Sequence, residues 1–150
     1  MIESVQETIV TLVSNSSALT FVNDEIRTKS ANCCGWLQHN EGSPIFKILE
    51  GGIYEINFNA NLTSATAGTI AVGLYEDGIL IPGTTTIVEV ATAGDYYNVS
   101  FSKLRKICCR GDATLSVQAV PSVLTGVDPV ATETEIPIYQ NANFSIVKKA

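Results

Sequence analysis

Short runs of alternating apolar and polar residues, separated by turn-forming residues, recur along most of the chain. The clearest run is GGIYEINFNA, where a glycine pair at Gly51-Gly52 precedes apolar residues at Ile53, Ile56, Phe58 and Ala60. From Ile56 onward the alternation is strict, which is the period-two pattern of a strand with one buried face. This run therefore predicts a β-strand that starts directly after a turn.

The same reasoning predicts further strands at residues 8–13, 19–26, 45–49, 69–75, 79–81, 85–90, 96–104, 113–120 and 142–147. Turn clusters such as Glu76-Asp77-Gly78 separate these runs at intervals close to the 8–12 residues expected of a β-sandwich or barrel. We find no helical periodicity. We therefore expect one all-β domain over residues 1–150, with about ten short antiparallel strands and with N-terminal strands or an arm in residues 1–30.

Segment 121–137 departs from this rhythm, because it holds three prolines and no convincing alternation. A long loop inside a compact domain is commonly functional or disordered. We expect either an exposed loop that binds a ligand or a neighbouring subunit, or a tolerated surface insertion.

Composition limits the classes of partner that the chain can have. The chain has 150 residues, 45% of them hydrophobic, and no apolar run close to the roughly 18 residues that a membrane-spanning helix needs. Its net charge of −6 argues against nucleic acid as the main partner. The N-terminal MIESVQETIV lacks the basic and apolar regions of a secretory signal, so we expect either a removed signal or another route of release.

Four of the nine basic residues lie close together, at Lys103, Arg105, Lys106 and Arg110. Such a cluster could bind an anion or a glycan. The alternative, which we favour, is a solvated strand face, because Lys103 and Arg105 are two residues apart and share one side of a strand.

The cysteines form two vicinal pairs, Cys33-Cys34 and Cys108-Cys109, and His39 is the only histidine. Adjacent cysteines are poor zinc chelators, so we expect no metal site and no cofactor. A disulfide between the pairs and four reduced thiols both remain open.

Other motifs have plain explanations. Arg110-Gly111-Asp112 spells the integrin-binding tripeptide, yet Gly-Asp is an ordinary turn before a strand. Asn-x-Ser/Thr occurs at Asn15, Asn61, Asn98 and Asn143, and we attribute these matches to an Asn- and Thr-rich composition. Neither a catalytic triad around His39 nor a paired-carboxylate cleft is evident, so we do not expect an enzyme.

Several segments together resemble the tumour necrosis factor-like jelly roll, including the globular heads of complement-type collagenous proteins. These are Gly52, Tyr54, Ile56 and Phe58, the hairpin from Gly73 to Ile81, the Gly111-Asp112 turn before Thr114, Leu115 and Val117, and the closing strand at residues 143–147. The resemblance covers residues 45 to 147. It implies an all-β jelly-roll sandwich that assembles as a homotrimer.

More narrowly, GGIYEINFNA, ATAGTIAVGLYEDG and QNANFSIV are similar to segments of small trimeric jelly-roll proteins of phages and prophages, and of spore-surface glycoproteins. This similarity implies a phage virion protein, a head fibre or decoration or a tail-fibre tip, that contacts other virion proteins and attaches to a host surface glycan. The alternatives are a bacterial spore- or cell-surface trimer and a secreted cytokine-like ligand.

Candidate site residues follow from these expectations. Adjacent strand residues face opposite ways, so one tyrosine of Tyr96-Tyr97 must leave the core. Since the resemblance implies that one sheet face lines a three-fold axis, we place the trimer interface at Tyr75, Tyr96, Tyr97 and Tyr139. We place ligand binding in the apical loops, chiefly residues 121–137, and in the grooves between subunits, with Asp128, Glu133, Glu135 and Tyr139 as the candidate residues.

Overall fold

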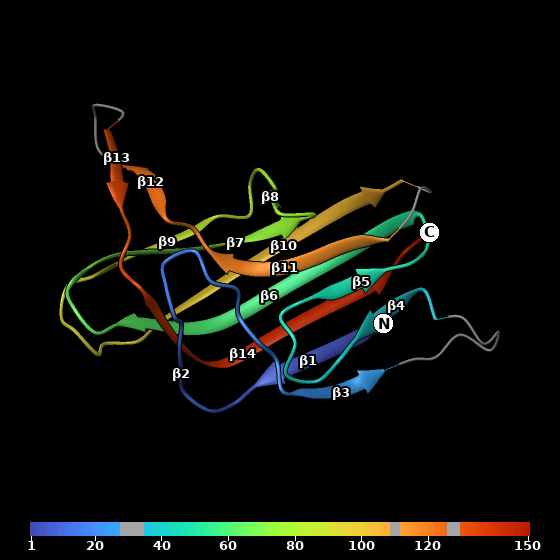
Figure 1. The fold of residues 1–150 in the computed structure, drawn as a ribbon, viewed down its shortest axis with the longest axis horizontal. Helices are drawn as coiled ribbons and strands as arrows, with labels where there is room; N and C mark the ends of the chain where they lie inside the picture. The colour runs from blue at the N-terminus through green and yellow to red at the C-terminus, as the bar shows by residue number, and fades with distance from the viewer. Residues whose placement is uncertain (28–34, 109–111, 126–129) are drawn as a thin grey trace.

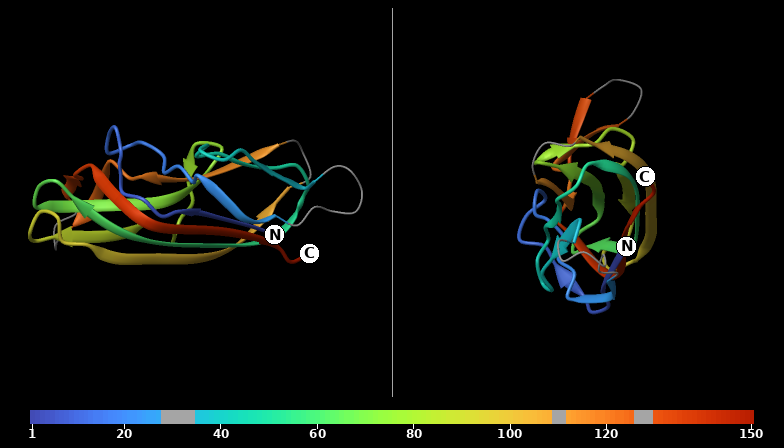
Figure 2. Two further views of the ribbon diagram at one scale, coloured as in Figure 1. Left: turned by 90° about the horizontal axis from the view of Figure 1, so that it is seen from below. Right: turned by 90° about the vertical axis from the view of Figure 1, so that its right-hand side faces the viewer.

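Two antiparallel sheets pack face to face in the computed structural model, which describes residues 1–27, 35–108, 112–125 and 130–150 (Figures 1 and 2). Sheet A contains, in spatial order, β10 (Tyr97–Ile107), β6 (Gly52–Ser64), β14 (Pro137–Lys148), β1 (Ile2–Gln6) and β3 (Asn23–Arg27), and β2 (Val10–Thr11) pairs with β14. Sheet B contains β4 (Leu37–His39), β5 (Phe46–Ile48), β11 (Ala113–Ala119), β7 (Gly68–Glu76) and β8 (Ile79–Leu80), and β9 (Thr86–Val90) pairs with β7. The predicted all-β sandwich is confirmed.

A separate hairpin stands away from both sheets. It consists of β12 (Ser122–Thr125) and β13 (Val130–Glu133), and Figure 1 shows it projecting at the upper left. In the described ranges no helix is present that could cross a membrane.

The strand predicted from the GGIYEINFNA run is the long central strand β6. Its side chains alternate between the core and the outside, and Ile56, Phe58 and Ala60 are buried. The predicted hairpin turn at Asp77-Gly78 is also present. Both residues have positive φ, 51° and 80°, as a tight two-residue hairpin turn requires.

The core joins the two sheets through aromatic side chains. Phe144 of β14 lies with its ring centre 4.8 Å from that of Phe46 on β5, and Phe21 packs on both rings at 5.6–5.7 Å. All three are fully buried. A second pair, Phe58 and Phe101 at 5.2 Å, links β6 to β10 within sheet A. Edge-to-face and offset contacts of this kind stabilise beyond the area that they bury.

Polar pairs close the two open edges of the sandwich. At one edge, His39 Nδ1 of β4 lies 2.6 Å from Asp24 Oδ1 of β3, and both side chains are buried. At the other edge, Arg105 Nε of β10 donates to Glu76 Oε2 of β7 at 2.5 Å. Each pair therefore connects sheet A to sheet B where the apolar core ends.

Two segments differ from the sequence predictions. Strand β1 was not predicted, because its inward positions include the polar Ser4 and Gln6, which break the expected alternation. Segment 121–137 was expected as a loop, and the structure corrects this: it contains the β12–β13 hairpin. Thr134 N donates to Pro121 O and Thr134 Oγ1 donates to Val120 O, which closes the base of the hairpin. Val120 N donates to Ala71 O and Glu135 N donates to Thr69 O, which fixes that base to β7.

Candidate functional site

The outward side of sheet A carries a dense set of neutral polar side chains, which we name the amide face. It alternates with the buried residues of β10, β6 and β14, so the side chains point away from the core. Its members are Asn57, Asn59, Asn61, Asn98, Ser100, Ser102, Gln140, Asn143 and Ser145.

Strand register aligns the amide face into cross-strand rows. Asn61 of β6 stands opposite Asn98 of β10 on one side and Gln140 of β14 on the other. One row further, Asn59 stands between Ser100 and Asn143. A bulge in β14, where Asn141 has φ 48°, adds one residue between these two rows and keeps their side chains on the same side.

Hydrogen bonds connect the amides to one another. Asn59 Nδ2 donates to Asn98 Oδ1 at 3.0 Å, and Asn98 Nδ2 donates to Asn61 Oδ1 at 2.9 Å. Asn143 Nδ2 donates to Glu3 Oε1 at 2.5 Å, at the margin formed by β1. The central amides are therefore held in fixed orientations on the surface.

Apolar and charged side chains lie beyond the amide face along β10 and β6. Tyr96 is 38% exposed and directly precedes β10, while Leu104 is 63% exposed toward the other end of that strand. Ile53 is exposed near Leu104, and Glu55, which pairs with Lys149 at 2.7 Å, lies between β10 and β14 at this end. The charges thus lie at the margin and the neutral amides at the centre.

The comparisons with known proteins concern the fold. No family model matches the sequence, and no curated protein matches it. Solved structures do match. A crystal structure of murine APRIL at pH 8.0 has a TM-score of 0.59 at 12% identity, over 99% of this chain and 97% of that chain. The Eiger TNF structure from S. frugiperda has a TM-score of 0.66 at 13% identity, over 99% of this chain and 91% of that chain.

The globular domain of the zebrafish complement 1qA protein also matches, with a TM-score of 0.57 at 12% identity, over 99% of this chain and 96% of that chain. Cytokine and complement-head structures therefore share the two-sheet arrangement described above. The fold is a tumour necrosis factor-like jelly roll. At these identities the likeness establishes the fold of this chain, as the resemblance of residues 45 to 147 implied.

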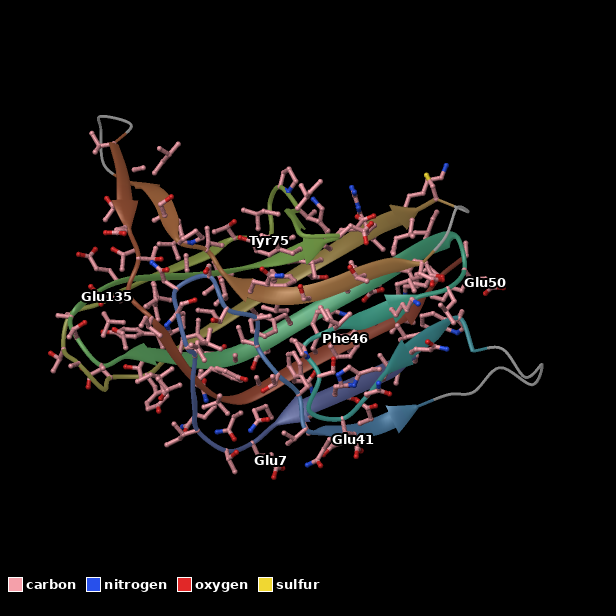
Figure 3. All side chains as sticks on the ribbon, in the orientation of Figure 1. Glu7, Glu41, Phe46, Glu50, Tyr75 and Glu135 are labelled. Atoms are coloured by element: carbon pink, nitrogen blue, oxygen red, sulfur yellow. The ribbon has the colours of Figure 1, made fainter. Side chains whose placement is uncertain are left out.

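The four tyrosines predicted at the trimer interface do not share one surface of the jelly roll. Tyr75 of β7 belongs to sheet B, where it packs beside Ala71. Tyr97 faces the core, and only Tyr96 of the vicinal pair is exposed. Figure 3 shows Tyr75 high on the sandwich, well away from the end that holds Glu135.

The predictions of Tyr139 as an interface residue and as a binding residue are both wrong. Its side chain has no exposed surface. Its hydroxyl accepts from Thr20 N at 2.8 Å and donates to Thr20 O at 3.1 Å. Strand β14 turns this position inward, so Tyr139 holds the segment before β3 against sheet A.

We expect Tyr139→Phe to lower the free energy of unfolding by about 1–3 kcal/mol near neutral pH, because the backbone N–H and C=O of Thr20 both lose their hydrogen bond to the phenol. Burial raises the pKa of the Tyr139 phenol above its usual range, against the lowering effect of the Thr20 hydrogen bonds. The stability contributed by this raised pKa is complete below pH of about 10 and is lost as pH rises through the folded-state value.

Tyr139→Phe should therefore also show a shallower fall of stability above pH of about 10 than the unchanged protein. Urea denaturation at pH 7.5 and at several alkaline pH values measures both effects. Tyr96→Phe, at an exposed position, is the matched control and should change stability at neutral pH by less than about 0.5 kcal/mol. Equal loss in the two variants would contradict the structural role of Tyr139.

The predicted acidic binding residues are placed only in part. Asp128 lies outside the described residues. Glu133 is exposed on β13, where it stands opposite Ser122. Glu135 Oε2 accepts from Thr66 Oγ1 at 2.8 Å, and its backbone N–H donates to Thr69 O, so it ties the base of the hairpin to the start of β7. Of these acids, Glu133 is the described residue with an exposed side chain.

The basic cluster lies at the edge of the sandwich where β10 meets β7. Arg105 pairs with Glu76, and Lys103 Nζ donates to Pro82 O at 3.0 Å. Lys106 is exposed, and Arg110 lies outside the described residues. Lys103 and Arg105 share one side of β10, as predicted, but this side faces sheet B and is not a solvated strand face.

The remaining sequence candidates are placed as follows. Cys108 is exposed and carries a free thiol, whereas Cys33, Cys34 and Cys109 lie outside the described residues, as do Arg110 and Gly111. Asp112 pairs with Lys47 at 2.5 Å. The disulfide and the integrin-type motif stay open. Within the described part of the chain, no group of three or more His, Cys, Asp or Glu residues could hold a metal ion.

One signal for the amide face was present in the sequence. The polar half of the alternation in β6 is Asn57, Asn59 and Asn61, and the other asparagine-containing run, QNANFS, contributes Gln140 and Asn143. The apolar half of each run indicates the core. The polar half identifies the opposite face, and three of the four Asn-x-Ser/Thr matches lie on it.

Proposed function

We propose that this chain is a homotrimeric, non-enzymatic structural and binding module of a phage particle, a head fibre or decoration or a tail-fibre tip, that attaches to a host surface glycan. The observation that carries the proposal is the jelly-roll fold, matched over at least 99% of this chain in cytokine and complement-head structures. The phage assignment rests on the narrower resemblance of GGIYEINFNA, ATAGTIAVGLYEDG and QNANFSIV to phage and prophage jelly rolls.

The shape of the molecule supports a presenting role. Both termini lie toward one end of the sandwich, while the β6–β7 and β9–β10 connections and the base of the β12–β13 hairpin lie toward the other (Figure 1). A particle that holds the first end leaves the second free to meet a host surface. Exposed Glu133 and the hairpin belong to this second end.

The roles of the polar side chains support a protein without catalysis. His39 lies between the Asp24 carboxylate and the Ser43 carbonyl, at 2.6 and 2.9 Å, and stacks on Phe46. Glu76 and Asp77 bond to Arg105 and Thr114. These groups join strands to one another, which is a structural use of residues that an enzyme would direct toward a substrate.

The trimer is tested first. Sedimentation velocity of the purified protein at micromolar concentration should give three times the chain mass of 16.0 kDa. Dilution over two orders of magnitude should leave that mass unchanged if the assembly is tight. A stable monomer throughout would overturn the proposed function.

Attachment is tested separately. The trimer should be retained on immobilised cell-wall polysaccharide of the host, and Glu133→Gln should reduce retention because it removes an exposed carboxylate at the free end. Glu25→Gln removes an exposed acid from β3, which pairs with β1 toward the end that holds the termini, and is the matched control. Retention lost equally in both variants, or absent in the unchanged protein, would contradict glycan attachment through the hairpin end.

The particle itself distinguishes the phage role from its alternative. Mass spectrometry of purified virions should detect the chain together with capsid or tail proteins. Detection on spores or on the cell surface, and absence from virions, would instead support the bacterial surface trimer.

A further inference from the structure

We propose that the outer edge of strand β12 binds an extended segment of another protein, which adds to the β12–β13 hairpin as a third strand. The segment is neutral or basic and carries an apolar side chain. This inference goes beyond the proposed function, because it requires neither a trimer nor a glycan. It assigns a docking role to Ser122 and Leu124, on the strand that pairs with β13.

Backbone groups on this edge are available for hydrogen bonds. Thr134 N donates to Pro121 O, so residues 121 and 134 continue the ladder as a hydrogen-bonded pair. Bonded and non-bonded pairs alternate in an antiparallel ladder, so the N–H and C=O groups of Ser122 and Leu124 point away from β13. Outside the ladder, neither residue makes a backbone hydrogen bond to another residue that the structure describes. An extended peptide offers donors and acceptors at the same two-residue spacing.

No feature of β12 blocks the pairing of a further strand. Natural edge strands are commonly protected by a charged side chain, a proline or a bulge. Residues 122–125 read SVLT, without charge or proline, and their register with β13 shows no shift. Ser122 is exposed, and Leu124 is 69% exposed. Strand β13, in contrast, carries the exposed Glu133, so the unprotected edge is that of β12.

A third strand would also stabilise the small sheet. A two-stranded hairpin alone is marginal in water, and each added strand brings new cross-strand contacts. Val123 already faces the sandwich, where it packs with Ala71 and Val120. Leu124 and its cross-strand neighbour Ala131 face the other way and are exposed. An apolar side chain opposite Leu124 on the added segment would cover part of this surface.

Charge favours another protein over a second copy of this chain. The chain carries a net charge of −6, and Glu133 and Glu135 lie in β13 and shortly after it. A second hairpin would bring the same negative charges close to these acids, whereas a neutral or basic segment would not be repelled. The hairpin therefore fits a partner strand without acidic residues.

The probe is a short acetylated and amidated peptide of alternating threonine and valine with a lysine at each end. NMR spectra of the ¹⁵N-labelled, deuterated protein are recorded at pH 6.5 as the peptide is added. We expect the amide signals of Ser122 and Leu124 to shift progressively, with a Kd of about 1 mM or tighter, because main-chain hydrogen bonds supply the affinity in strand addition. The same peptide methylated on its valine nitrogens cannot donate these bonds and should not bind.

Two matched proline variants locate the edge. Ser122→Pro and Ala131→Pro each remove one outward N–H from the hairpin, on β12 and β13 respectively, and leave the ladder bonds in place. Ser122→Pro should weaken peptide binding by at least about tenfold, because it removes a donor and places a ring against the added strand. Ala131→Pro should leave the Kd within about twofold. Leu124→Lys keeps the strand but adds a charge that protects the edge, so it should also weaken binding by at least about tenfold.

The outcomes separate this inference from the proposed function. Shifts at Ser122 and Leu124 that Ser122→Pro abolishes and Ala131→Pro retains would support strand addition to β12. No shift at millimolar peptide, equal loss in the two proline variants, or undiminished binding of the methylated peptide would overturn it. Assembly beyond the trimer that only Ser122→Pro abolishes, without peptide binding, would also overturn it, because a second copy would then occupy the edge. The trimer mass and the retention on polysaccharide test the proposed function, and both should be unchanged in Ser122→Pro.

Discussion

Replacing Phe144 with alanine is expected to lower the free energy of unfolding by about 3–5 kcal/mol, as for other large-to-small changes of a buried aromatic residue. Phe144 is fully buried and touches Phe21 and Phe46, so its loss opens a cavity between the two sheets. A typical domain is stable by only about 5–15 kcal/mol, so this single change should leave the fold marginal.

Equilibrium urea denaturation, followed by circular dichroism, measures the effect. The control is Val13→Ala, which shortens an apolar side chain that is 92% exposed and should change stability by less than about 0.5 kcal/mol. A loss below about 1.5 kcal/mol for Phe144→Ala would show that the three phenylalanines do not hold the sheets together.

The fold could be predicted where one face of a strand is apolar and the turns use special residues. In β6, Ile56, Phe58 and Ala60 alternate with polar residues, and each is buried as the pattern indicates. The Asp77-Gly78 turn was equally predictable, because few residue pairs tolerate positive φ at both positions. In such places the local sequence is sufficient to predict the structure.

The fold could not be predicted where buried strand positions carry polar side chains. Strand β1 turns Ser4 and Gln6 inward. Ser4 bonds to Asp24, which is 20 residues away, and Gln6 bonds to Thr8, which the structure places outside the strands. Hydrophobic periodicity contains no information about a polar residue that is buried because a distant partner satisfies it. The hairpin of β12 and β13 was not predicted for a related reason. Prolines interrupt the sequence pattern around two short strands that pair only with each other.

The candidate site could not be predicted from the sequence alone either. The sequence identified tyrosines as surface candidates, but only the register of β14 decides that Tyr139 points inward. The amide face is formed by three strands that are distant in the chain. Asn59, Asn98 and Asn143 become neighbours only through the order β10-β6-β14, which a single sequence does not reveal.

The polar pairs at the two open edges differ in how much stability they should carry. Arg105 is 40% exposed beside Glu76, and ion pairs in such solvent-exposed settings contribute about 0–1 kcal/mol. The pair of Asp24 and His39 is buried, with side-chain exposures of 6% and 0%. Losing one partner of a buried pair leaves the other without compensation, so this edge should be the sensitive one.

Asp24→Ala is therefore expected to cost about 3–5 kcal/mol of unfolding free energy. Asp24 Oδ1 accepts from Ser4 Oγ at 2.5 Å and faces His39 Nδ1 at 2.6 Å, so the change removes a connection among β1, β3 and β4 at once. Urea denaturation measures the loss. The control is Glu7→Ala, because Glu7 is exposed and Figure 3 places it at the lower margin of the molecule.

A double-mutant cycle separates the contact from the general cost of truncation. If Asp24 and His39 stabilise the edge through each other, His39→Leu should destabilise the Asp24→Ala background far less than it destabilises the unchanged protein. Phe46, on which the His39 ring stacks at 3.9 Å, can still pack against leucine, so the apolar part of the contact is retained. Additive losses in the double variant, or a loss from Glu7→Ala as large as that from Asp24→Ala, would show that this edge is not held by the buried pair.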